Sequence, residues 1–400
     1  MAPSSVTIVG ASLAGLRAAE ALRRRGFDGP VRLIGAEAHP PYDRPPLSKQ
    51  VLAGEWEPER AQLTDAGRLG DLDIDWWPGR RAESLSLAER ELTLDDGTRL
   101  AVDGVVIATG AVPRHLPVEP TPPGVHVLRT LDDAVALRDE LDAGPRRVVV
   151  VGAGFIGAEV AATCRGRGLE VTLVEALDVP LGRVLGRDMG RVCAEIHLDH
   201  GVDLRCGVTV TGFEGRERVE GVRLGDGSVV DADVVVVGIG VTPATAWLES
   251  SGLTLDDGVV CDETCLAAPG VVAAGDVARW PNPRFGETMR VEHWDNAVQQ
   301  GAHAAARLLA SDAEAEPYAP VPWFWSDQYD RKIQLAGRVR PDDEVRVVVG
   351  STAERRFVAL YGRAGRLVGV LAMNRPRHLM AYRTLLEQGA SFDDALAAEV

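Results

Sequence analysis

Two stretches of this chain repeat one pattern of apolar and polar positions, and their glycine turns lie 142 residues apart. Residues 6–15 and 148–157 each combine a run of apolar, mostly β-branched residues, a glycine-rich turn and the start of a segment with helical spacing. A second β-branched run follows each one, at residues 31–34 and 171–174. Because strand, crossover helix and parallel strand form one βαβ unit, the pattern predicts two doubly wound α/β folds of the kind that bind dinucleotides.

Shorter elements are predicted further along the chain. Turn residues between apolar runs indicate strand pairs over 90–100 and 216–233, and buried strands are expected at 105–110 and 234–238. Beyond an acidic, proline-containing linker at 311–322, we expect a separate α+β domain. Its predicted elements are three or four strands, near 333–335, 345–349, 357–361 and 367–371, and an amphipathic helix near 379–388.

Composition narrows the possible functions. The 400 residues carry a formal net charge of −16, which argues against nucleic acid as a partner because phosphate binding needs a concentrated positive surface. Five cysteines without a C-x-x-C pair suit neither a disulfide framework nor a zinc site. The first apolar run leads directly into the strand-turn-helix pattern, and no stretch approaches the length of a membrane span. We therefore expect a soluble, cytoplasmic protein.

The second glycine turn, Gly152-Ala-Gly154-Phe-Ile-Gly157, has the complete G-x-G-x-x-G spacing. The first glycine permits a tight turn, the second lets the backbone approach a pyrophosphate, and the third allows close helix packing. Glu175 lies eighteen residues further on, at the end of the next predicted strand. A carboxylate at this place accepts hydrogen bonds from ribose hydroxyls and repels a 2′-phosphate, so the pattern predicts a site for NADH rather than NADPH.

The first turn, Gly10-Ala-Ser12-Leu-Ala-Gly15, departs from that spacing because serine replaces the middle glycine. Serine is still small enough for a phosphate to approach, and Glu37 stands 22 residues after Gly15 in the ribose-binding place. We expect a second dinucleotide here, the alternative being a relic of duplication that binds none. Two dinucleotide sites in one chain suggest electron transfer between two cofactors.

Five further stretches carry a resemblance to a known family. They are residues 41–49 (PYDRPPLSK), 108–110 (ATG), 274–276 (AGD), 292–297 (EHWDNA) and 323–328 (WFWSDQ). With them the whole chain resembles the FAD-dependent pyridine nucleotide oxidoreductases, specifically the ferredoxin reductases of bacterial oxygenase systems, of the putidaredoxin reductase and biphenyl-dioxygenase ferredoxin reductase types. The resemblance implies a glutathione-reductase-like fold. Its expected segments are an FAD domain split between 1–112 and 240–320, an NADH domain at 113–239 and the C-terminal α+β domain at 321–400.

The resemblance also implies roles for individual residues. Those expected at FAD are Gly10, Ser12, Ala14, Gly15, Glu37, Arg44, Lys49, Ala82, Arg129, Gly275, Asp276 and Trp294. The remaining cofactor-binding residues are expected to be Gly152, Gly154, Ile156, Gly157, Glu159, Glu175, Arg183 and Gly240. Asp276 would hydrogen-bond the ribityl chain of FAD, and the backbone of Trp294 would lie near the isoalloxazine.

Three residues are expected to take part in the chemistry: Lys49, Glu159 and Trp325. Lys49 is one of only two lysines in the chain, and the resemblance places it close to flavin N5. Glu159 would face it across the nicotinamide site, so we predict a Lys49–Glu159 ion pair; the alternative is a surface pair of little energetic value. Trp325 would pack beside the flavin ring, the alternative being an ordinary core tryptophan.

Cysteine chemistry is excluded at the expected flavin site. Disulfide reductases of this superfamily carry a C-x4-C at the start of the helix that would begin here near Pro45, and residues 44–49 contain no cysteine. Thiol–disulfide exchange needs an attacking thiolate, so it cannot proceed there. Cys261 and Cys265 are expected to form an inert buried pair in a strand and turn, and His293 is expected to pack rather than to catalyse.

The implied activity is hydride transfer from NADH to FAD and then transfer of single electrons to a small iron–sulfur ferredoxin, which feeds a haem monooxygenase or a Rieske-type dioxygenase. Because such ferredoxins are acidic, transient docking on this acidic chain would need a local basic surface. Seven arginines and no acidic residue lie between Arg355 and Arg383, so we predict a docking patch that includes Arg355 and Arg356; the alternative is a solvated face. A rubredoxin reductase and an NADH-binding redox sensor that acts as an interaction protein are the alternative functions.

Overall fold

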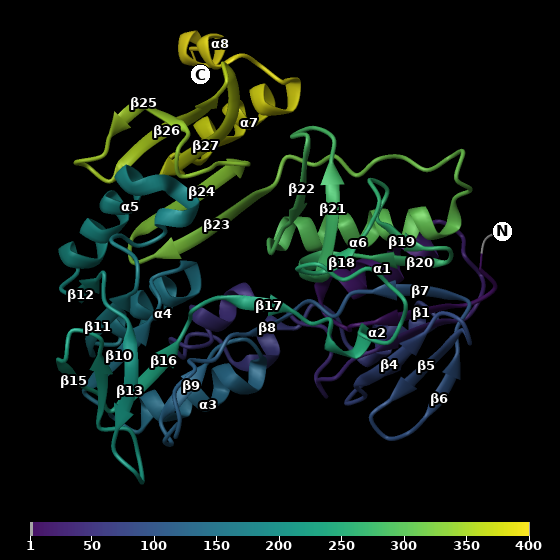
Figure 1. Cartoon of the computed structure of the whole chain (residues 1–400), viewed down its shortest axis with the longest axis horizontal. Coiled ribbons are helices and arrows are strands. Elements are labelled where there is room, and N and C mark those ends of the chain that lie inside the picture. Colours follow the sequence, from purple (N-terminus) through teal and green to yellow (C-terminus); the bar gives the residue numbers. More distant parts are fainter. Residues whose placement is uncertain (1–2, 400) are drawn as a thin grey trace. The chain divides into compact units, whose positions relative to one another are not determined.

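The structure, a computed structural model, describes residues 3–399. The chain forms two compact units, each built from three separate stretches of sequence. The first unit comprises residues 3–43, 62–112 and 242–322, and the second comprises residues 44–61, 113–241 and 323–399. The helices and strands of both are labelled in Figure 1.

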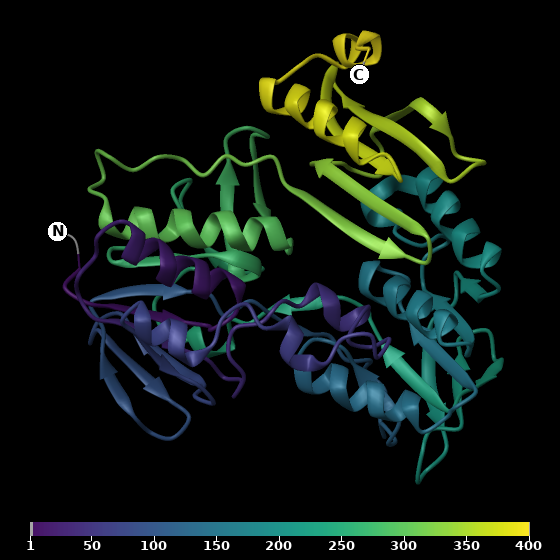
Figure 2. The ribbon, with the colours of Figure 1, turned by 180° about the vertical axis from the view of Figure 1, so that it is seen from behind.

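A mainly parallel six-stranded sheet forms the centre of the first unit. Its strand order is β19-β20-β7-β1-β2-β3, and only β19 runs antiparallel to its neighbour. The strands are β1 (Val6–Val9), β2 (Val31–Ile34), β3 (Ile74–Trp77), β7 (Gly104–Ile107), β19 (Leu266–Ala268) and β20 (Val271–Ala273). Two helices, α1 (Leu13–Arg24) and α6 (Trp294–Leu309), pack side by side, as the purple and green helices of Figure 2 show.

Smaller elements complete the first unit. One three-stranded antiparallel sheet contains β4 (Ala82–Ser86), β5 (Glu91–Leu94) and β6 (Arg99–Ala101). A mixed three-stranded sheet contains β18 (Val259–Val260), which runs parallel to β21 (Ala278–Asn282), and β22 (Glu287–Arg290), which runs antiparallel to β21. The short helices are α2 (Ala66–Asp71), η3 (Ala246–Leu248) and η4 (Gly275–Val277).

The second unit repeats the parallel architecture. The strand order is β12-β11-β10-β16-β9, and every neighbouring pair is parallel. The strands are β9 (Val125–Val127), β10 (Arg147–Val151), β11 (Glu170–Glu175), β12 (Asp203–Cys206) and β16 (Val234–Val237). The helices are α3 (Leu131–Asp142), α4 (Phe155–Gly166) and α5 (Gly182–Asp199), with the short η1 (Pro45–Ser48) and η2 (Pro58–Ala61). A small antiparallel sheet contains β13 (Val210–Glu214), β14 (Gly221–Leu224) and β15 (Val229–Asp231). The short strands β8 (Ala111–Pro113) and β17 (Val241–Pro243) pair with each other, and each contains the point at which the chain passes from one unit to the other.

The C-terminal part of the second unit is an antiparallel sheet that packs on α5. Its order is β23-β24-β27-β26-β25, comprising β23 (Trp323–Gln328), β24 (Arg331–Gly337), β25 (Glu344–Ser351), β26 (Arg356–Arg363) and β27 (Arg366–Met373), with helices α7 (Pro376–Gln388) and α8 (Phe392–Ala397). Phe357 and Met373 share a hydrophobic cluster with Leu185 and Cys193 of α5. The Tyr361 hydroxyl donates to the Leu185 carbonyl at 2.9 Å. Figure 1 shows α5, in teal, against this yellow-green sheet.

The local sequence accounts for the central elements. Valines at 148–151 and 234–237 are almost fully buried, as expected of β-branched residues in a parallel sheet covered on both faces. Helix α3 begins at a capping box, in which the Thr130 hydroxyl accepts from the Asp133 N–H and the Asp133 carboxylate accepts from the Thr130 N–H. Such local signals are strong enough to place these strands and this helix.

The predicted α/β class, both βαβ units and the C-terminal α+β domain are confirmed. The sequence analysis did not predict β23, a short aromatic stretch, and it missed helix α6, although the apolar positions of α6 follow a helical period. Residues 44–61 belong to the second unit, although the sequence analysis grouped them with the residues before them. The division into four functional segments stays a prediction. Among residues 3–399, no helix is both long and apolar enough to cross a membrane.

We expect the second unit to lose stability as the pH falls from 6.5 towards 4. Burial, with a smaller contribution from the nearby His200, lowers the pKa of His197 from 6.5 to about 4. The His197 Nδ1 lies 2.9 Å from the Tyr329 hydroxyl, which links α5 to the turn after β23. Between these pH values the unfolded chain binds a proton that the folded chain does not, so stability is present above 6.5 and is lost as the pH falls. The unfolding free energy should fall by about 3 kcal/mol at most over this pH range.

Urea unfolding of the wild type and of His197→Gln at several pH values tests this expectation. The glutamine variant should show a smaller loss of unfolding free energy across this range, because its amide can meet Tyr329 without titrating. Parallel pH profiles for the two proteins would contradict the assignment to His197.

Candidate active site

The first glycine turn joins β1 to α1 in the first unit. Gly10 has a φ of +115°, and a Cβ at Gly10 would overlap the Ala108 carbonyl. A Cβ at Gly15 would overlap the Gly10 carbonyl. Ser12 is the N-cap of α1, and its side chain makes no capping hydrogen bond within the described chain. The first N–H groups of α1 are therefore open to an anion, and the turn fits a pyrophosphate despite its serine.

Other residues predicted for this site converge on the same turn. Glu37 follows β2, the parallel neighbour of β1, and accepts a hydrogen bond from the Tyr42 hydroxyl. Gly275 and Asp276 lie in η4, where Gly275 packs closely against Ala14 of α1. The structure thus gathers the turn, η4 and α1 within one unit.

The position of Gly275 is fixed by a buried amide that the sequence analysis did not identify. Gln300 of α6 is fully buried and accepts from the Gly275 N–H at 2.9 Å. Trp294, at the start of α6, donates its indole N–H to Asp43 at 2.6 Å. The predicted contact between the backbone of Trp294 and a flavin stays a prediction. Ala82 begins β4, and no described contact tests its predicted role.

The second glycine turn, between β10 and α4, is built in the same way. A Cβ at Gly152 would overlap the Gly238 carbonyl, and a Cβ at Gly157 would overlap the Gly152 carbonyl. At Gly154, the N-cap of α4, an added Cβ meets nothing within 4 Å in the described chain. The turn is therefore tight where it packs and open at the helix N-terminus, which is the shape that a pyrophosphate needs.

Glu175, at the end of β11, is bound to this turn. One carboxylate oxygen accepts from the Ala153 N–H at 2.8 Å and the other from the Leu177 N–H at 2.9 Å. Each oxygen keeps a lone pair for a ribose hydroxyl. The carboxylate is thus held beside the glycine turn, and its predicted role of meeting a ribose and repelling a 2′-phosphate stays a prediction.

Replacing Gly154 by alanine tests whether this open space receives the nucleotide. The φ of Gly154 is −73° and its added Cβ is unobstructed, so the fold should keep its unfolding free energy. The methyl group would occupy the approach of a pyrophosphate, and we expect the Kd for NADH to rise about tenfold. Equal NADH binding by Gly154→Ala and wild type, measured by titration calorimetry, would place the nucleotide elsewhere. Gly166→Ala, on an open part of α4, is the matched control.

Lys49 and Glu159 form the predicted ion pair. Lys49 Nζ lies 2.6 Å from Glu159 Oε2, and the two side chains are only 13% and 4% exposed. The Ser48 hydroxyl donates to the same oxygen at 2.5 Å. The contact is confirmed, and the alternative of a surface pair is wrong. A buried charge without a partner lowers the free energy of unfolding, so loss of either side chain should destabilise the fold through the charge that remains.

One stripe of α4 attaches the segment around Lys49 to the second unit. It contains Glu159 and Thr163 of α4 and the C-cap residue Arg167, which are spaced by four positions. The Thr163 hydroxyl donates to the Ser48 carbonyl at 2.7 Å, and Arg167 donates to the Leu52 carbonyl at 2.8 Å. Leu52 is buried in the hydrophobic cluster of the second parallel sheet. These contacts explain why residues 44–61 pack with the second unit rather than with the residues before them.

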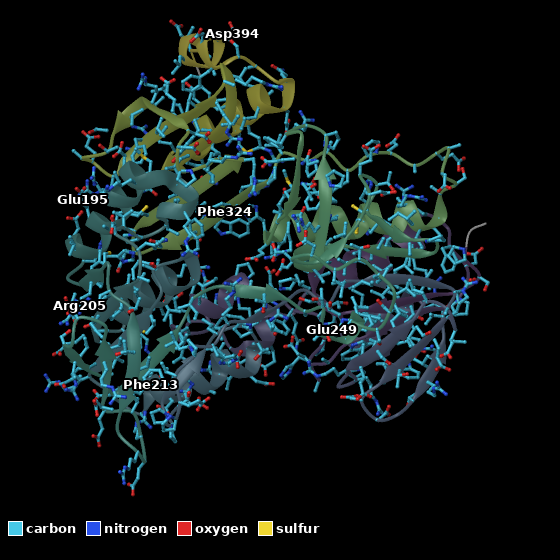
Figure 3. All side chains as sticks on the ribbon, viewed as in Figure 1. Glu195, Arg205, Phe213, Glu249, Phe324 and Asp394 are labelled. Carbon is cyan, nitrogen blue, oxygen red and sulfur yellow. The ribbon has the colours of Figure 1, made fainter. Side chains whose placement is uncertain are left out.

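Trp325 lies on β23 and is partly exposed, unlike the fully buried Trp280. Its ring centroid is 5.6 Å from that of Trp323, the next side chain on the same face of the strand. The opposite face of β23 carries Phe324, labelled in Figure 3, whose ring meets Phe155 at the start of α4 with centroids 4.5 Å apart. Trp325 is therefore not an ordinary core residue, and its expected place beside a flavin stays a prediction.

The remaining predicted residues lie in the second unit as follows. Arg44 donates a hydrogen bond to the Arg129 carbonyl, just before the capping box of α3. Ile156 is 47% exposed on the first turn of α4, next to the glycine turn. Gly240 follows β16 with a φ of +97°. Arg183 is exposed on the first turn of α5, and no described contact connects it with the other site residues.

The cysteines do not form a redox centre. All five are free, and burial raises the pKa of the Cys261 thiol to about 12 and that of Cys265 well above its usual range. The prediction of an inert buried pair is confirmed. Among the described residues, no group of three or more histidine, cysteine or acidic side chains could hold a metal ion.

Sequence reasoning missed the hydroxyl and amide groups that hold the site together. These are Ser48, Thr163, Gln300, Ser326 and Gln328. Ser48 lies within the stretch that carries the resemblance, so its neighbour Lys49 could have drawn attention to it. Ser326 and Gln328 lie in another of these stretches, residues 323–328, but only the tertiary fold brings them to Glu159.

Comparison with known proteins gives consistent results along the chain. Residues 4–301 match the family described as pyridine nucleotide-disulphide oxidoreductase, and residues 323–400 match the family described as reductase C-terminal. The chain is 39% identical to rhodocoxin reductase of Rhodococcus erythropolis, over 96% of this chain and 89% of the relative. It is 38% identical to the ferredoxin–NAD(+) reductase component of the anthranilate 1,2-dioxygenase system of Burkholderia cepacia, over 100% and 98% of the two chains.

Among solved structures, the chain resembles the reductase in a covalent complex of putidaredoxin reductase and putidaredoxin. The TM-score is 0.93 at 33% identity, and the match covers 100% of this chain and 97% of the other. The likeness thus extends over both glycine turns and the C-terminal sheet. The resemblance seen in the sequence motifs is confirmed.

Proposed function

The chain belongs to the pyridine nucleotide-disulphide oxidoreductase family, and we propose that within this family it is an NADH-dependent, FAD-containing reductase of a small iron–sulfur ferredoxin. The observation that carries the proposal is the buried Lys49–Glu159 pair. Glu159 lies one turn beyond the open N-terminus of α4, and residues 44–49, which carry its partner Lys49, contain no cysteine for disulfide exchange. The named relatives are reductase components of oxygenase systems and add support.

The bound cofactors supply the redox chemistry, which is hydride transfer from NADH to FAD followed by release of single electrons. The protein chain binds the two cofactors and orients them. The N–H groups at the starts of α1 and α4 would hold the two pyrophosphates, and Glu37 and Glu175 would hold the two adenosine riboses. We assign FAD to the first unit and NADH to residues 113–239 of the second.

Lys49 and Glu159 would set the electrostatics around the reacting rings. The Lys49 ammonium is a compact cation that is 13% exposed, and its charge favours electron density that develops close by. Glu159 fixes the position of that ammonium and limits its movement. No group in this arrangement has to act as a general acid or base, since hydride transfer moves no separate proton.

The proposed partner is acidic, so its docking needs a basic surface, and the structure corrects the one predicted from sequence. Arg355 is only 14% exposed and lies 2.9 Å from Glu195 and 3.3 Å from Asp199 of α5, so it serves an internal ion-pair cluster. Glu195 is labelled in Figure 3. Arg363 is likewise paired with the buried Asp343. Acidic residues distant in sequence neutralise this part of the predicted patch, whereas Arg356 is exposed.

Replacing Arg356 by glutamate tests the remaining docking surface. The KM for ferredoxin should rise about threefold to tenfold at low salt while kcat stays close to that of the wild type, because rim charges act mainly on encounter. Steady-state kinetics at several salt concentrations measures this effect. Arg355→Glu, by contrast, would place a third carboxylate beside two others and should lower the unfolding free energy. An unchanged KM for Arg356→Glu that is also insensitive to salt would exclude this face.

The proposed function is tested by a coupled steady-state assay with FAD-loaded protein, NADH, a [2Fe–2S] ferredoxin and cytochrome c. Cytochrome reduction should depend on the ferredoxin and rise with its concentration. Substitution of rubredoxin for the ferredoxin separates the two kinds of acceptor. Reduction that needs rubredoxin, or none with either carrier, would overturn the proposal.

We also propose that the protein works in the cytoplasm. Its five cysteines are all free, which suits a reducing compartment. NADH is likewise a cytoplasmic reductant. Activity confined to an isolated periplasmic fraction of the source cells would contradict this location.

A further inference from the structure

The carboxylate of Glu159 is held from two sides. Its Oε2 accepts from Lys49 at 2.6 Å and from Ser48 at 2.5 Å, both in the segment before η2. Its Oε1 accepts from the Ser326 hydroxyl of β23 at 2.8 Å. Ser326 in turn accepts from the Gln328 side-chain amide at 3.1 Å. A directed chain of donors therefore runs from the C-terminal sheet to the Lys49–Glu159 pair.

The strand and the helix match each other in spacing at this contact. Phe155 and Glu159 stand one helical turn apart on α4, a rise of about 6 Å. Phe324 and Ser326 stand two residues apart on β23, about 6.6 Å. Phe324 packs on Phe155 while Ser326 bonds Glu159, so an apolar contact and a hydrogen bond align the two elements at once.

The serine contact is buried throughout. Ser326 and Gln328 are both 0% exposed and Glu159 is 3% exposed. Water cannot readily replace the serine hydroxyl at such a site, and a buried carboxylate oxygen that loses a donor keeps the full cost of its desolvation. The contact therefore has a larger effect on the carboxylate than an exposed hydrogen bond would have.

We propose that Ser326, supported by Gln328, is a positioning residue that holds Glu159, and through it the Lys49 ammonium, in the place required for hydride transfer. The importance of that place rests on the proposed function. Trp325 occupies the opposite face of the same strand. Because one strand carries both residues, a movement of β23 at Trp325 would also change the hydrogen bond to Glu159.

Lysine labelling tests the positioning directly, without reference to turnover. The chain has only two lysines, Lys49 and Lys332, and the Lys332 side chain is 46% exposed. An amine-reactive reagent followed by peptide mass spectrometry therefore reports Lys49 with Lys332 as an internal reference. In FAD-loaded Ser326→Ala, we expect Lys49 to label about tenfold faster than in wild type, with Lys332 unchanged. Equal labelling of Lys49 would overturn the proposal.

Two controls separate positioning from a general loss of structure. Ser326→Thr keeps a hydroxyl and should restore slow labelling of Lys49. Ser251→Ala removes another buried serine hydroxyl, one that donates to the Leu248 carbonyl in the first unit, and should leave Lys49 protected. Faster labelling in Ser251→Ala, or in Ser326→Thr to the same degree as in Ser326→Ala, would indicate only loosened packing and would overturn the assignment.

Rapid mixing with NADH then tests whether the position of the Lys49–Glu159 pair affects the rate of flavin reduction. Ser326→Ala should reduce its flavin about tenfold more slowly at saturating NADH, while the Kd for NAD⁺ changes less than about twofold because Glu175 and the glycine turn are untouched. In a Glu159→Gln background, Ser326→Ala should have no further effect, since both act through one contact. Additive effects would overturn the proposal. If the wild type itself is not reduced by NADH, the proposed function fails, whereas the labelling result still decides whether Ser326 positions the pair.

Discussion

Replacing Lys49 by methionine should slow flavin reduction by NADH about a hundredfold and lower the unfolding free energy of the second unit by about 3–5 kcal/mol. The methionine fills a similar volume but leaves Glu159, whose side chain is 4% exposed, without its cation. Breaking a buried pair on one side costs this much because the remaining charge stays buried. Rapid mixing measures the first effect and urea unfolding measures the second.

The chain supplies its own control for this substitution. Lys332 pairs with Asp327 at 3.2 Å, but the two side chains are 46% and 37% exposed, so Lys332→Met should change stability by less than about 1 kcal/mol. The double variant Lys49→Met/Glu159→Leu removes both charges and should regain most of the lost unfolding free energy. Its flavin should still be reduced slowly by NADH. If Lys49→Met alone were as stable and as fast as the wild type, the pair would have neither role.

Replacing Glu175 by glutamine should lower the preference for NADH over NADPH about tenfold or more. The amide keeps an oxygen that can accept from the Ala153 N–H, and it removes the charge that repels a 2′-phosphate. Glu175→Ala should weaken binding of both nucleotides, because the Ala153 and Leu177 N–H groups then lose their acceptor. The ratio of kcat/KM for the two nucleotides measures the preference.

Glu170 provides the matched control for Glu175. It lies at the other end of β11, is exposed and pairs with Arg146 at 3.1 Å. Glu170→Gln changes the net charge by the same amount as Glu175→Gln and should leave the nucleotide preference intact. A preference that shifts equally in both variants would mean that overall charge, not the ribose contact, selects NADH.

The features that sequence predicted well are local ones. Both glycine turns are encoded within ten residues, because each requires a backbone without a Cβ at fixed positions. The valine runs of β10 and β16 are long enough to specify buried parallel strands. The Lys49–Glu159 pair joins residues 110 positions apart, and the resemblance to a family made it predictable, whereas local pattern did not.

The features that sequence missed depend on which elements the fold brings together. Arg355 stood out as part of a basic stretch, yet α5 supplies Glu195 and Asp199 from about 160 positions away to neutralise it. Ser326 lies in residues 323–328, which carry the resemblance, but its role was missed because a serine in a strand becomes important only when α4 presents Glu159 opposite it. Residues 44–61 were grouped by chain order, but hydrogen bonds from Thr163 and Arg167 attach them to the second unit.

The central claim, that this chain passes electrons from NADH through FAD to a ferredoxin, is tested most directly by rapid mixing in two steps. FAD-loaded protein is mixed anaerobically with NADH, or separately with NADPH, and then with oxidised [2Fe–2S] ferredoxin. We expect fast bleaching of the flavin band with NADH, much slower bleaching with NADPH, and return of the band as ferredoxin is reduced. A preparation that takes up no FAD, or bleaching by NADH that no ferredoxin reverses, would contradict the account, and the second outcome would favour a redox sensor.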